Sequence, residues 1–211
     1  MRMAPWSVSF ASLMLATSMI GSAVWGQGRL RGTVRLGGDF GGDKVLQFQY
    51  SDGSTPDVPA GAGLLLTAGG ALQAFQLGRG ALDVQVNVGI KYRTIPPATN
   101  QSATWSRFPV EGLVLYRAPY GLRAGGGVAL HLANVLEASG AVANDRVEFK
   151  TKPGLVLQTE YVRRHWAFDV RYTLMKYEVA SGGSGTVNAN SFGAGLSYWF
   201  GRSAVGSAKG Q

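Results

Sequence analysis

The stretch 81–93 restricts the possible fold more than any other part of the sequence. It reads ALDVQVNVGIKYR, with an apolar residue at every second position from Leu82 to Tyr92 and a polar residue or glycine between them. Successive side chains of a β-strand point to opposite faces, whereas a helix would scatter these apolar residues around its axis. The pattern predicts a strand with one apolar face and one polar face.

Seven further segments alternate in the same way, although the facing of one of them, 63–75, is ambiguous. The others are 32–41, 108–116, 122–132, 155–161, 166–177 and 190–200. Repeated alternating segments of about ten residues are typical of transmembrane β-barrels. We therefore predict an all-β fold, a closed antiparallel up-and-down transmembrane barrel of eight strands.

The connections between these segments alternate in length. Short links cover 76–80, 118–121 and 162–165, and long ones cover 42–62, 94–107, 133–153 and 179–190. Short periplasmic turns and long outer loops alternate in this way when both chain ends lie in the periplasm. Within the first long connection, 44–50 alternates and precedes the turn signal Asp52-Gly53, which predicts a hairpin above the membrane and leaves a ten-strand barrel as the alternative.

The N-terminus has the pattern of an export signal. Arg2 precedes a largely apolar stretch from Ser7 to Val24, and cleavage before Gln27 is expected. An uncleaved N-terminal anchor is the alternative. We predict a signal peptide over 1–26, an outer-membrane barrel over 27–200 and a flexible tail over 201–211.

Composition narrows the remaining classes. There is no cysteine, so disulfides are excluded, and the net charge of +8 comes from dispersed residues without the basic run typical of nucleic-acid binding. No segment after the N-terminus has the ~18 consecutive apolar residues of a membrane-spanning helix. The exported chain is therefore either soluble or a membrane barrel.

The distribution of polar and aromatic residues favours the membrane barrel over a soluble lipid-binding barrel. The polar faces carry Gly, Gln, Asn and few charges, fewer than a water-facing surface normally has. Aromatic residues fall where apolar faces would cross the lipid headgroups. We expect Tyr92, Phe108 and Phe192 at the outer rim, and Tyr116, Tyr161, Trp166 and Phe200 at the periplasmic rim.

An eight-stranded barrel is only wide enough inside for side chains to fill it. We predict that the inward charges form a packed network and not a pore, with Glu160 paired to Asp169–Arg171 on the next strand. The network on the periplasmic side is expected to contain Arg35, Asp83, Arg117, Arg123, Glu160, Asp169 and Arg171. Asp39, Lys91, Arg93, Glu111 and His131 are expected in the outer half.

The end of the last segment, Gly195-Leu-Ser-Tyr-Trp-Phe200, resembles the closing strand of bacterial outer-membrane barrels. The whole mature chain is similar to the small eight-stranded group that includes OmpX, OmpW and the OmpA membrane domain. The resemblance implies insertion into the cell outer membrane by the barrel-assembly machinery, and it implies no single activity. The chain departs from the pattern by continuing eleven residues beyond Phe200.

Chemistry-bearing residues are few. His131 and His165 are the two histidines, and position 133, where a nucleophilic serine of a lipid deacylase would stand, is Ala133. We therefore predict no enzymatic activity, no cofactor and no metal site. The glycine-rich segment 37–43 lacks the Lys-Ser/Thr of a phosphate loop and the acid spacing of a calcium loop, so glycine in a narrow barrel is the expected explanation.

Basic residues of the outer connections suggest one partner, outer-membrane lipid. A ring expected to contact lipopolysaccharide phosphates consists of Arg93, Arg107, Arg146, Lys150 and Lys152. The sequence thus predicts an outer-membrane barrel with a structural, interaction or envelope-maintenance role. Passage or binding of a small apolar solute is the first alternative, followed by a soluble periplasmic lipid binder and a lipopolysaccharide-modifying enzyme. The sequence indicates neither a specific ligand nor an oligomeric state.

Overall fold

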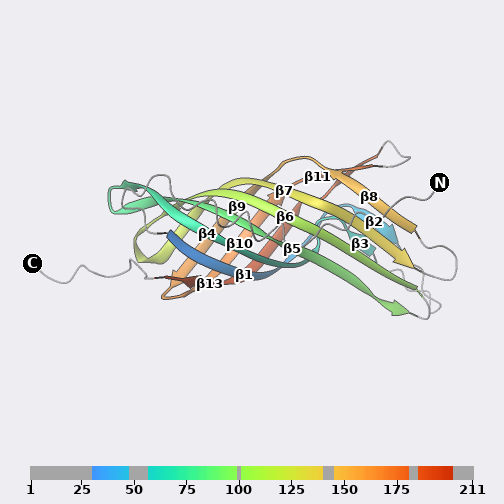
Figure 1. The fold of residues 1–211 in the computed structure, drawn as a ribbon, viewed down its shortest axis with the longest axis horizontal. Coiled ribbons are helices and arrows are strands. Elements are labelled where there is room, and N and C mark those ends of the chain that lie inside the picture. Colours follow the sequence, from blue (N-terminus) through green and yellow to red (C-terminus); the bar gives the residue numbers. More distant parts are fainter. Residues whose placement is uncertain (1–29, 48–56, 99–100, 140–144, 181–184, 202–211) are drawn as a thin grey trace, which may run out of the picture.

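Eight antiparallel strands close into a barrel in the computed structural model, which describes residues 30–47, 57–98, 101–139, 145–180 and 185–201 (Figure 1). The barrel strands are β1 (Leu30–Phe40), β4 (Gly63–Leu77), β5 (Gly80–Ala98), β6 (Gln101–Arg117), β7 (Leu122–Ser139), β9 (Gly154–Arg163), β10 (Trp166–Leu174) and β13 (Ser191–Phe200). Pairing of β1 with β13, from Gly32 opposite Phe200 to Phe40 opposite Phe192, closes the ring. The predicted eight-stranded barrel and its closing strand are confirmed. The expected signal peptide and all but the first residue of the expected tail lie outside the described residues.

Five shorter strands stand at one end of the barrel. β2 (Lys44–Gln47) and β3 (Asp57–Pro59) pair with each other in a separate two-stranded sheet. β8 (Asp145–Thr151), β11 (Lys176–Val179) and β12 (Thr186–Asn188) continue the barrel sheet outward from β7. Because β2 and β3 stay out of the barrel ladder, the ten-strand alternative is wrong. Its predicted turn at Asp52-Gly53 lies outside the described residues.

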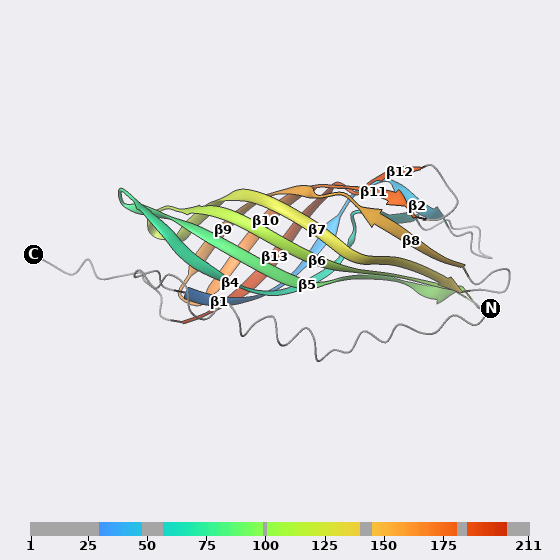
Figure 2. The same ribbon diagram turned by 45° about the horizontal axis from the view of Figure 1, so that its top comes forward.

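The two ends of the barrel carry different connections (Figure 2). We call the end that carries the short β4–β5, β6–β7 and β9–β10 connections, together with Leu30 and Phe200, the turn end. The opposite end, with β2, β3, β8, β11 and β12, is the extended end. A single 3-10 turn, η1 (Pro119–Gly121), joins β6 to β7. Among the described residues, no helix has the length and apolar character needed to cross a membrane.

Two of the four segments predicted as long loops, 94–107 and 133–153, are largely strand, and 179–190 contains the short β12, which corrects the prediction. β5 continues to Ala98, β6 begins at Gln101 and β7 continues to Ser139. The short strands β8, β11 and β12 extend the same sheet. β8 alternates too, but with charged residues outward: Arg146, Glu148 and Lys150 are exposed and Phe149 between them is buried. That facing suits a sheet in water, whereas the prediction sought apolar outward faces.

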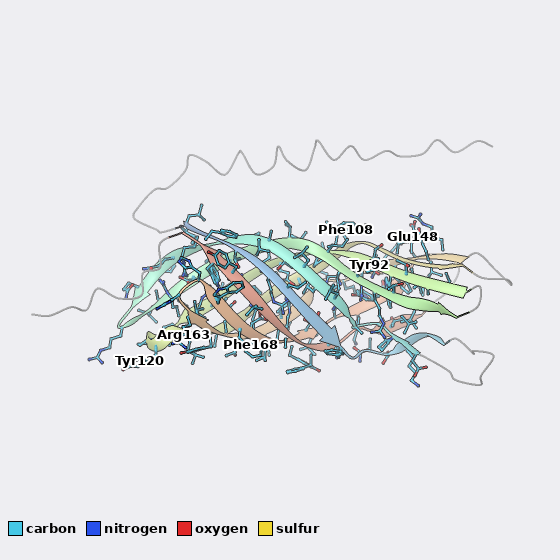
Figure 3. The ribbon with its side chains drawn as sticks, turned by 90° about the horizontal axis from the view of Figure 1, so that it is seen from below. Tyr92, Phe108, Tyr120, Glu148, Arg163 and Phe168 are labelled. Carbon is cyan, nitrogen blue, oxygen red and sulfur yellow. The ribbon has the colours of Figure 1, made fainter. Side chains whose placement is uncertain are left out.

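The outer surface of the barrel wall is apolar. Its exposed side chains include Val34, Leu36, Leu66, Val86, Val88, Val114, Leu157 and Leu196. The expected rim aromatics are all exposed on this face: Tyr92, Phe108 and Phe192 on one side, and Tyr116, Tyr161, Trp166 and Phe200 on the other. Figure 3 shows Tyr92 and Phe108 towards the extended end and Tyr120 and Arg163 towards the turn end. The apolar face points outward, so a soluble barrel with an apolar interior is ruled out.

Candidate functional site

A carboxylate surrounded by three arginines occupies the lumen near the turn end. Asp83 lies 3.2 Å from Arg31, 3.3 Å from Arg123 and 3.6 Å from Arg117. The guanidinium carbons of Arg31 and Arg123 also stand 4.7 and 4.6 Å from the ring centroid of Trp199. Alternation along β5 and β7 points Asp83 and Arg123 inward. Arg31 and Trp199 belong to this cluster too, and the sequence analysis did not include them in it.

Glu160 has a different partner from the one predicted. Its carboxylate accepts a hydrogen bond from Arg123 Nη1 at 2.6 Å and another from the side-chain amide of Gln158 at 2.7 Å. Arg123 stands directly opposite Glu160 in the β7–β9 register, whereas Arg171 stands opposite Gln158. The pairing of Glu160 with Arg171 was therefore wrong.

Arg35 reaches across a whole strand to form the next ion pair. It donates from Nε and Nη2 to Asp169 at 2.9 and 2.7 Å, although β13 separates β1 from β10. Gly195 of β13 makes this possible, because a Cβ there would lie 2.6 Å from an Arg35 nitrogen. The inward glycines of the closing strand thus leave room for charges from its neighbours.

Two further pairs fill the lumen towards the extended end. Arg171 Nη2 donates to Glu111 at 2.5 Å, although the two were expected in different halves of the barrel. Lys91 Nζ donates to Asp39 at 2.5 Å. All four side chains are at most 3% exposed. The seven residues expected in the network on the periplasmic side, together with Asp39, Lys91 and Glu111, therefore face inward and take part in ion pairs.

Beyond these ion pairs, towards the extended end, apolar and aromatic side chains fill the interior of the barrel. Trp105 stacks on Phe149 with ring centroids 5.4 Å apart and lies 6.0 Å from the ring of Tyr177. Leu136 from β7 and Val58 from β3 belong to the same buried cluster. Of this apolar core, Trp105, Phe149, Leu136 and Val58 lie in segments predicted as loops, whereas Tyr177 ends a predicted strand. The alternation of Val147 and Phe149 with charged neighbours is the sequence signal that could have located it.

The β2–β3 hairpin folds over this core instead of rising away from the barrel. Arg107 holds its base, donating from Nη1 to the Ala60 carbonyl at 2.7 Å and from Nη2 to the Ala62 carbonyl at 2.6 Å. Its guanidinium carbon also stands 4.6 Å from the centroid of the Trp105 ring. Arg107 is fully buried, so its expected contact with lipopolysaccharide is wrong.

The glycine-rich segment 37–43 has a mechanical role in this arrangement. Gly41 and Gly42 have φ of 113° and 92°, a region that other residues rarely adopt. The carboxylate of Asp43 accepts a hydrogen bond from the Asn188 backbone N–H at 2.9 Å. The segment therefore turns the chain from β1 into the hairpin and fastens it to β12.

The other residues of the expected basic ring differ in exposure. Arg93 faces inward and is half-buried, which removes it from a surface ring. Arg146 is exposed but lies 3.2 Å from Glu137 and 3.3 Å from Glu148. Lys150 is exposed, and Lys152 is exposed and pairs with Glu178 at 2.6 Å. Lys176, which the expected ring did not include, is exposed on the neighbouring β11.

Both histidines are engaged in structural contacts. His131 Nδ1 lies 2.6 Å from the Tyr177 hydroxyl, and His165 Nδ1 donates to the Trp199 carbonyl at 3.0 Å. Tyr177 lies beyond the apolar belt, and burial raises the pKa of its hydroxyl, which keeps its proton at neutral pH. Within the described ranges, no three or more His, Asp or Glu side chains form a group that could hold a metal ion.

Comparison with known proteins yields similarity in structure only. No family profile and no curated protein matches the sequence. Ail, the attachment invasion locus protein of Yersinia pestis, in complex with the heparin analogue sucrose octasulfate, has a TM-score of 0.51 and 10% identity, and the match covers 82% of this chain and 99% of Ail. Neisserial surface protein A has a TM-score of 0.41 and 10% identity over 80% of this chain and 96% of that one. Outer membrane protein AlkL, determined in lipid bilayers, has a TM-score of 0.41 and 16% identity over 88% of this chain and 96% of that one. Together with the closed barrel and its apolar belt, the similarity to Ail identifies the fold as that of the small eight-stranded outer-membrane β-barrels.

Proposed function

We propose that this chain is a non-conducting outer-membrane protein whose extended end forms an interaction surface outside the cell. The observation that carries the proposal is a reversal of facing along the strands. Leu155 and Leu157 of β9 point outward, whereas Arg146, Glu148 and Lys150 point outward from β8 in the same wall. A wall that is apolar outside in one part and charged outside in the next fits lipid and then water.

The filled interior supports a structural or interaction role over transport. Ion pairs cross the lumen at several levels, and the apolar core closes it towards the extended end. A role in passing apolar solutes would depend on that core, whose rings contact one another and whose open side is covered by the β2–β3 hairpin. We expect purified protein in planar bilayers to show no stable single-channel conductance. Reproducible channel steps would contradict the closed lumen and favour the solute alternative.

We further propose that lysines just beyond the apolar belt contact phosphates of lipopolysaccharide. Lys150 and Lys152 precede Leu155, the first outward apolar residue of β9, and Lys176 follows Leu174, the last outward apolar residue of β10. Glu178 pairs with Lys152 and stands opposite Lys150. Ail, which shares the fold, was solved with a polyanionic sugar, and a polyanionic glycolipid is the ligand class proposed here. Guanidinium and ammonium groups bind phosphate through charge-assisted hydrogen bonds.

The lysine proposal is tested by neutralisation. Replacing Lys150, Lys152 and Lys176 by Gln should weaken lipopolysaccharide association at low salt, and the difference should shrink at high salt because of screening. Lys44→Gln is the matched control, since Lys44 is exposed on the hairpin and pairs with Asp57. Equal binding by the triple variant would contradict the proposal.

We propose that residues 1–26 are removed, that the barrel-assembly machinery inserts the barrel, and that the turn end, with Leu30 and Phe200, faces the periplasm. Because the chain has no cysteine, single cysteines report topology cleanly. Glu148→Cys at the extended end should react with a membrane-impermeant maleimide in intact cells. Tyr120→Cys, 93% exposed at the turn end, should react only after permeabilisation. The reverse pattern would overturn the orientation. The expected absence of enzymatic activity stays a prediction.

A further inference from the structure

Exposed charges are distributed unequally between the two ends. Among the described side chains, the acidic ones that reach the surface all lie at the extended end: Asp43, Asp57, Glu137, Glu148 and Glu178. At the turn end, Asp83 and Glu160 are each 1% exposed inside the lumen. Arg79 and Arg163 are exposed there. In the described part of the chain, the surface of the turn end therefore carries positive charge alone.

The β9–β10 turn, which carries Arg163, is fastened to the closing strand. The Trp199 N–H donates to the His165 carbonyl at 2.7 Å, and His165 Nδ1 donates back to the Trp199 carbonyl at 3.0 Å. Arg164 completes the turn with φ of 57°. This reciprocal pair of hydrogen bonds fixes the position of the turn beside β13, so Arg163 projects from a held backbone.

Aromatic rings gather on the outer surface next to Arg163. The Tyr198 ring centroid lies 5.7 Å from His165, 5.0 Å from Trp166 and 5.0 Å from Phe200. Trp166 and Phe200 are about half exposed. Tryptophan and tyrosine concentrate at the level of lipid headgroups, because one side of the ring is apolar and the other is polar. Arg163 follows Tyr161 on the same outward face and stands opposite Trp166, which in turn stands opposite Tyr198.

We propose that Arg163 and the ring cluster of Trp166, Tyr198 and Phe200 form a binding site for the phosphate headgroup of an anionic phospholipid. The inference rests on the proposed membrane location. A guanidinium matches a phosphate in two parallel hydrogen bonds, and the rings would lie along the upper acyl chains. Arg163 is on the outward face and the exposed surface around it lacks acids, so the site faces lipid and not the lumen. In the proposed orientation this is the periplasmic leaflet.

Tryptophan fluorescence provides a direct test. The chain from Gln27 onward contains three tryptophans, and Trp105 and Trp199 are 1% and 2% exposed inside the barrel, so Trp166 is the lipid-accessible one. The protein is reconstituted in bilayers that contain a small fraction of lipid brominated near the headgroup. Brominated phosphatidylglycerol and brominated phosphatidylcholine are compared at equal mole fraction. We expect local enrichment of phosphatidylglycerol of about fivefold, which corresponds to ~1 kcal/mol per basic residue near the surface.

Variants separate the site from general membrane insertion. Arg163→Gln should abolish the preference and leave quenching by phosphatidylcholine unchanged. Arg163→Lys keeps the charge but not the two parallel hydrogen bonds, so it should retain only part of the preference. Arg146→Gln at the extended end is the matched control and should behave as the unmodified chain. Raising the salt to 1 M should reduce the preference through screening.

The outcomes distinguish the inference from the proposal beneath it. Loss of quenching by both lipids would contradict the membrane location itself. Equal quenching by both lipids, or a preference that persists in Arg163→Gln, would overturn the headgroup site alone. If lipid preference is absent but soluble anionic peptidoglycan fragments protect Trp166 from an aqueous quencher, the patch binds a glycan polymer and the lipid proposal is wrong.

Discussion

The membrane part of the barrel and its extended end are built from the same strands with opposite facing. In the membrane part, apolar residues such as Leu196 point out and charges such as Asp169 point in. At the extended end, Glu148 points out and Phe149 points in. The backbone ladder is continuous through β7, which pairs with β9 below and β8 above. A strand therefore adapts to each solvent by its alternation alone.

The two interiors are also stabilised differently. The membrane part is held from inside by ion pairs, which are costly to bury unless both partners are present. The extended end is held by ring and aliphatic contacts around Trp105, in the manner of a soluble protein. Substitutions that are severe in one part should be mild in the other.

The largest effect is expected from a single charge in the lumen. Asp169→Asn leaves Arg35 buried without its carboxylate, and breaking such a pair should cost about 3–5 kcal/mol of unfolding free energy. Urea unfolding in phospholipid vesicles, followed by tryptophan fluorescence, measures the change. The double variant Arg35→Met/Asp169→Leu removes both charges and should recover most of the loss. A double variant less stable than the single one would show that the ion pair stabilises the barrel by more than the cost of burying its two charges.

The second-largest effect on stability is expected from a charge added to the outer surface of the membrane part, whereas the same charge at the extended end should have little effect. Leu196→Arg introduces a cation in the middle of the lipid-facing belt, opposite Leu36 and Phe168, and should cost about 2–4 kcal/mol. Thr186→Arg makes the same addition at an exposed position of β12 and should change stability by no more than about 0.5 kcal/mol. Equal effects in the two variants would contradict the boundary between lipid and water.

Trimming the apolar core should loosen the extended end while the barrel stays closed. Leu136→Ala removes buried atoms beside Trp105 and should cost about 2 kcal/mol, the lower end of the usual range, because the surrounding sheet ends at the free edge of β12 and can relax. Hydrogen exchange should rise in β8, β11 and β12, and heat-modifiable migration on gels should persist. Faster exchange throughout β1 and β13 would show that the two parts unfold as one.

The sequence predicted the membrane part well and the extended end poorly, for a physical reason. Lipid demands uninterrupted apolar faces, as in 81–93, whereas the extensions in water show short charged alternation that resembles a loop. Pro96 and Pro97 lie within such an extension, although proline cannot donate to a ladder. In the structure they lie in the part of β5 beyond Tyr92, where β4 has ended and only β6 is paired, so one edge is free.

The lumen partners were less predictable than the lumen residues. Alternation decides that Arg35 and Asp169 point inward, but their contact depends on Gly195 of the intervening strand having no side chain. Likewise, Arg171 reaches Glu111 across the barrel and not along the sheet. In a narrow lumen several carboxylates lie within reach of each long arginine side chain, so strand order alone does not predict which of them it pairs with.

The smallest effect is expected from the surface charges of the extended end. Arg146 is 60% exposed and stands between Glu137 and Glu148, the geometry of a solvent-exposed network. Arg146→Gln should lower stability by about 0.2–1 kcal/mol at low salt, because exposed pairs gain little in water. The difference should vanish at 1 M salt, whereas the loss in Asp169→Asn should remain, since a buried pair is screened much less. A salt-insensitive loss in Arg146→Gln would mean that this triad lies in a drier environment than its exposure indicates, and would move the lipid boundary towards β8.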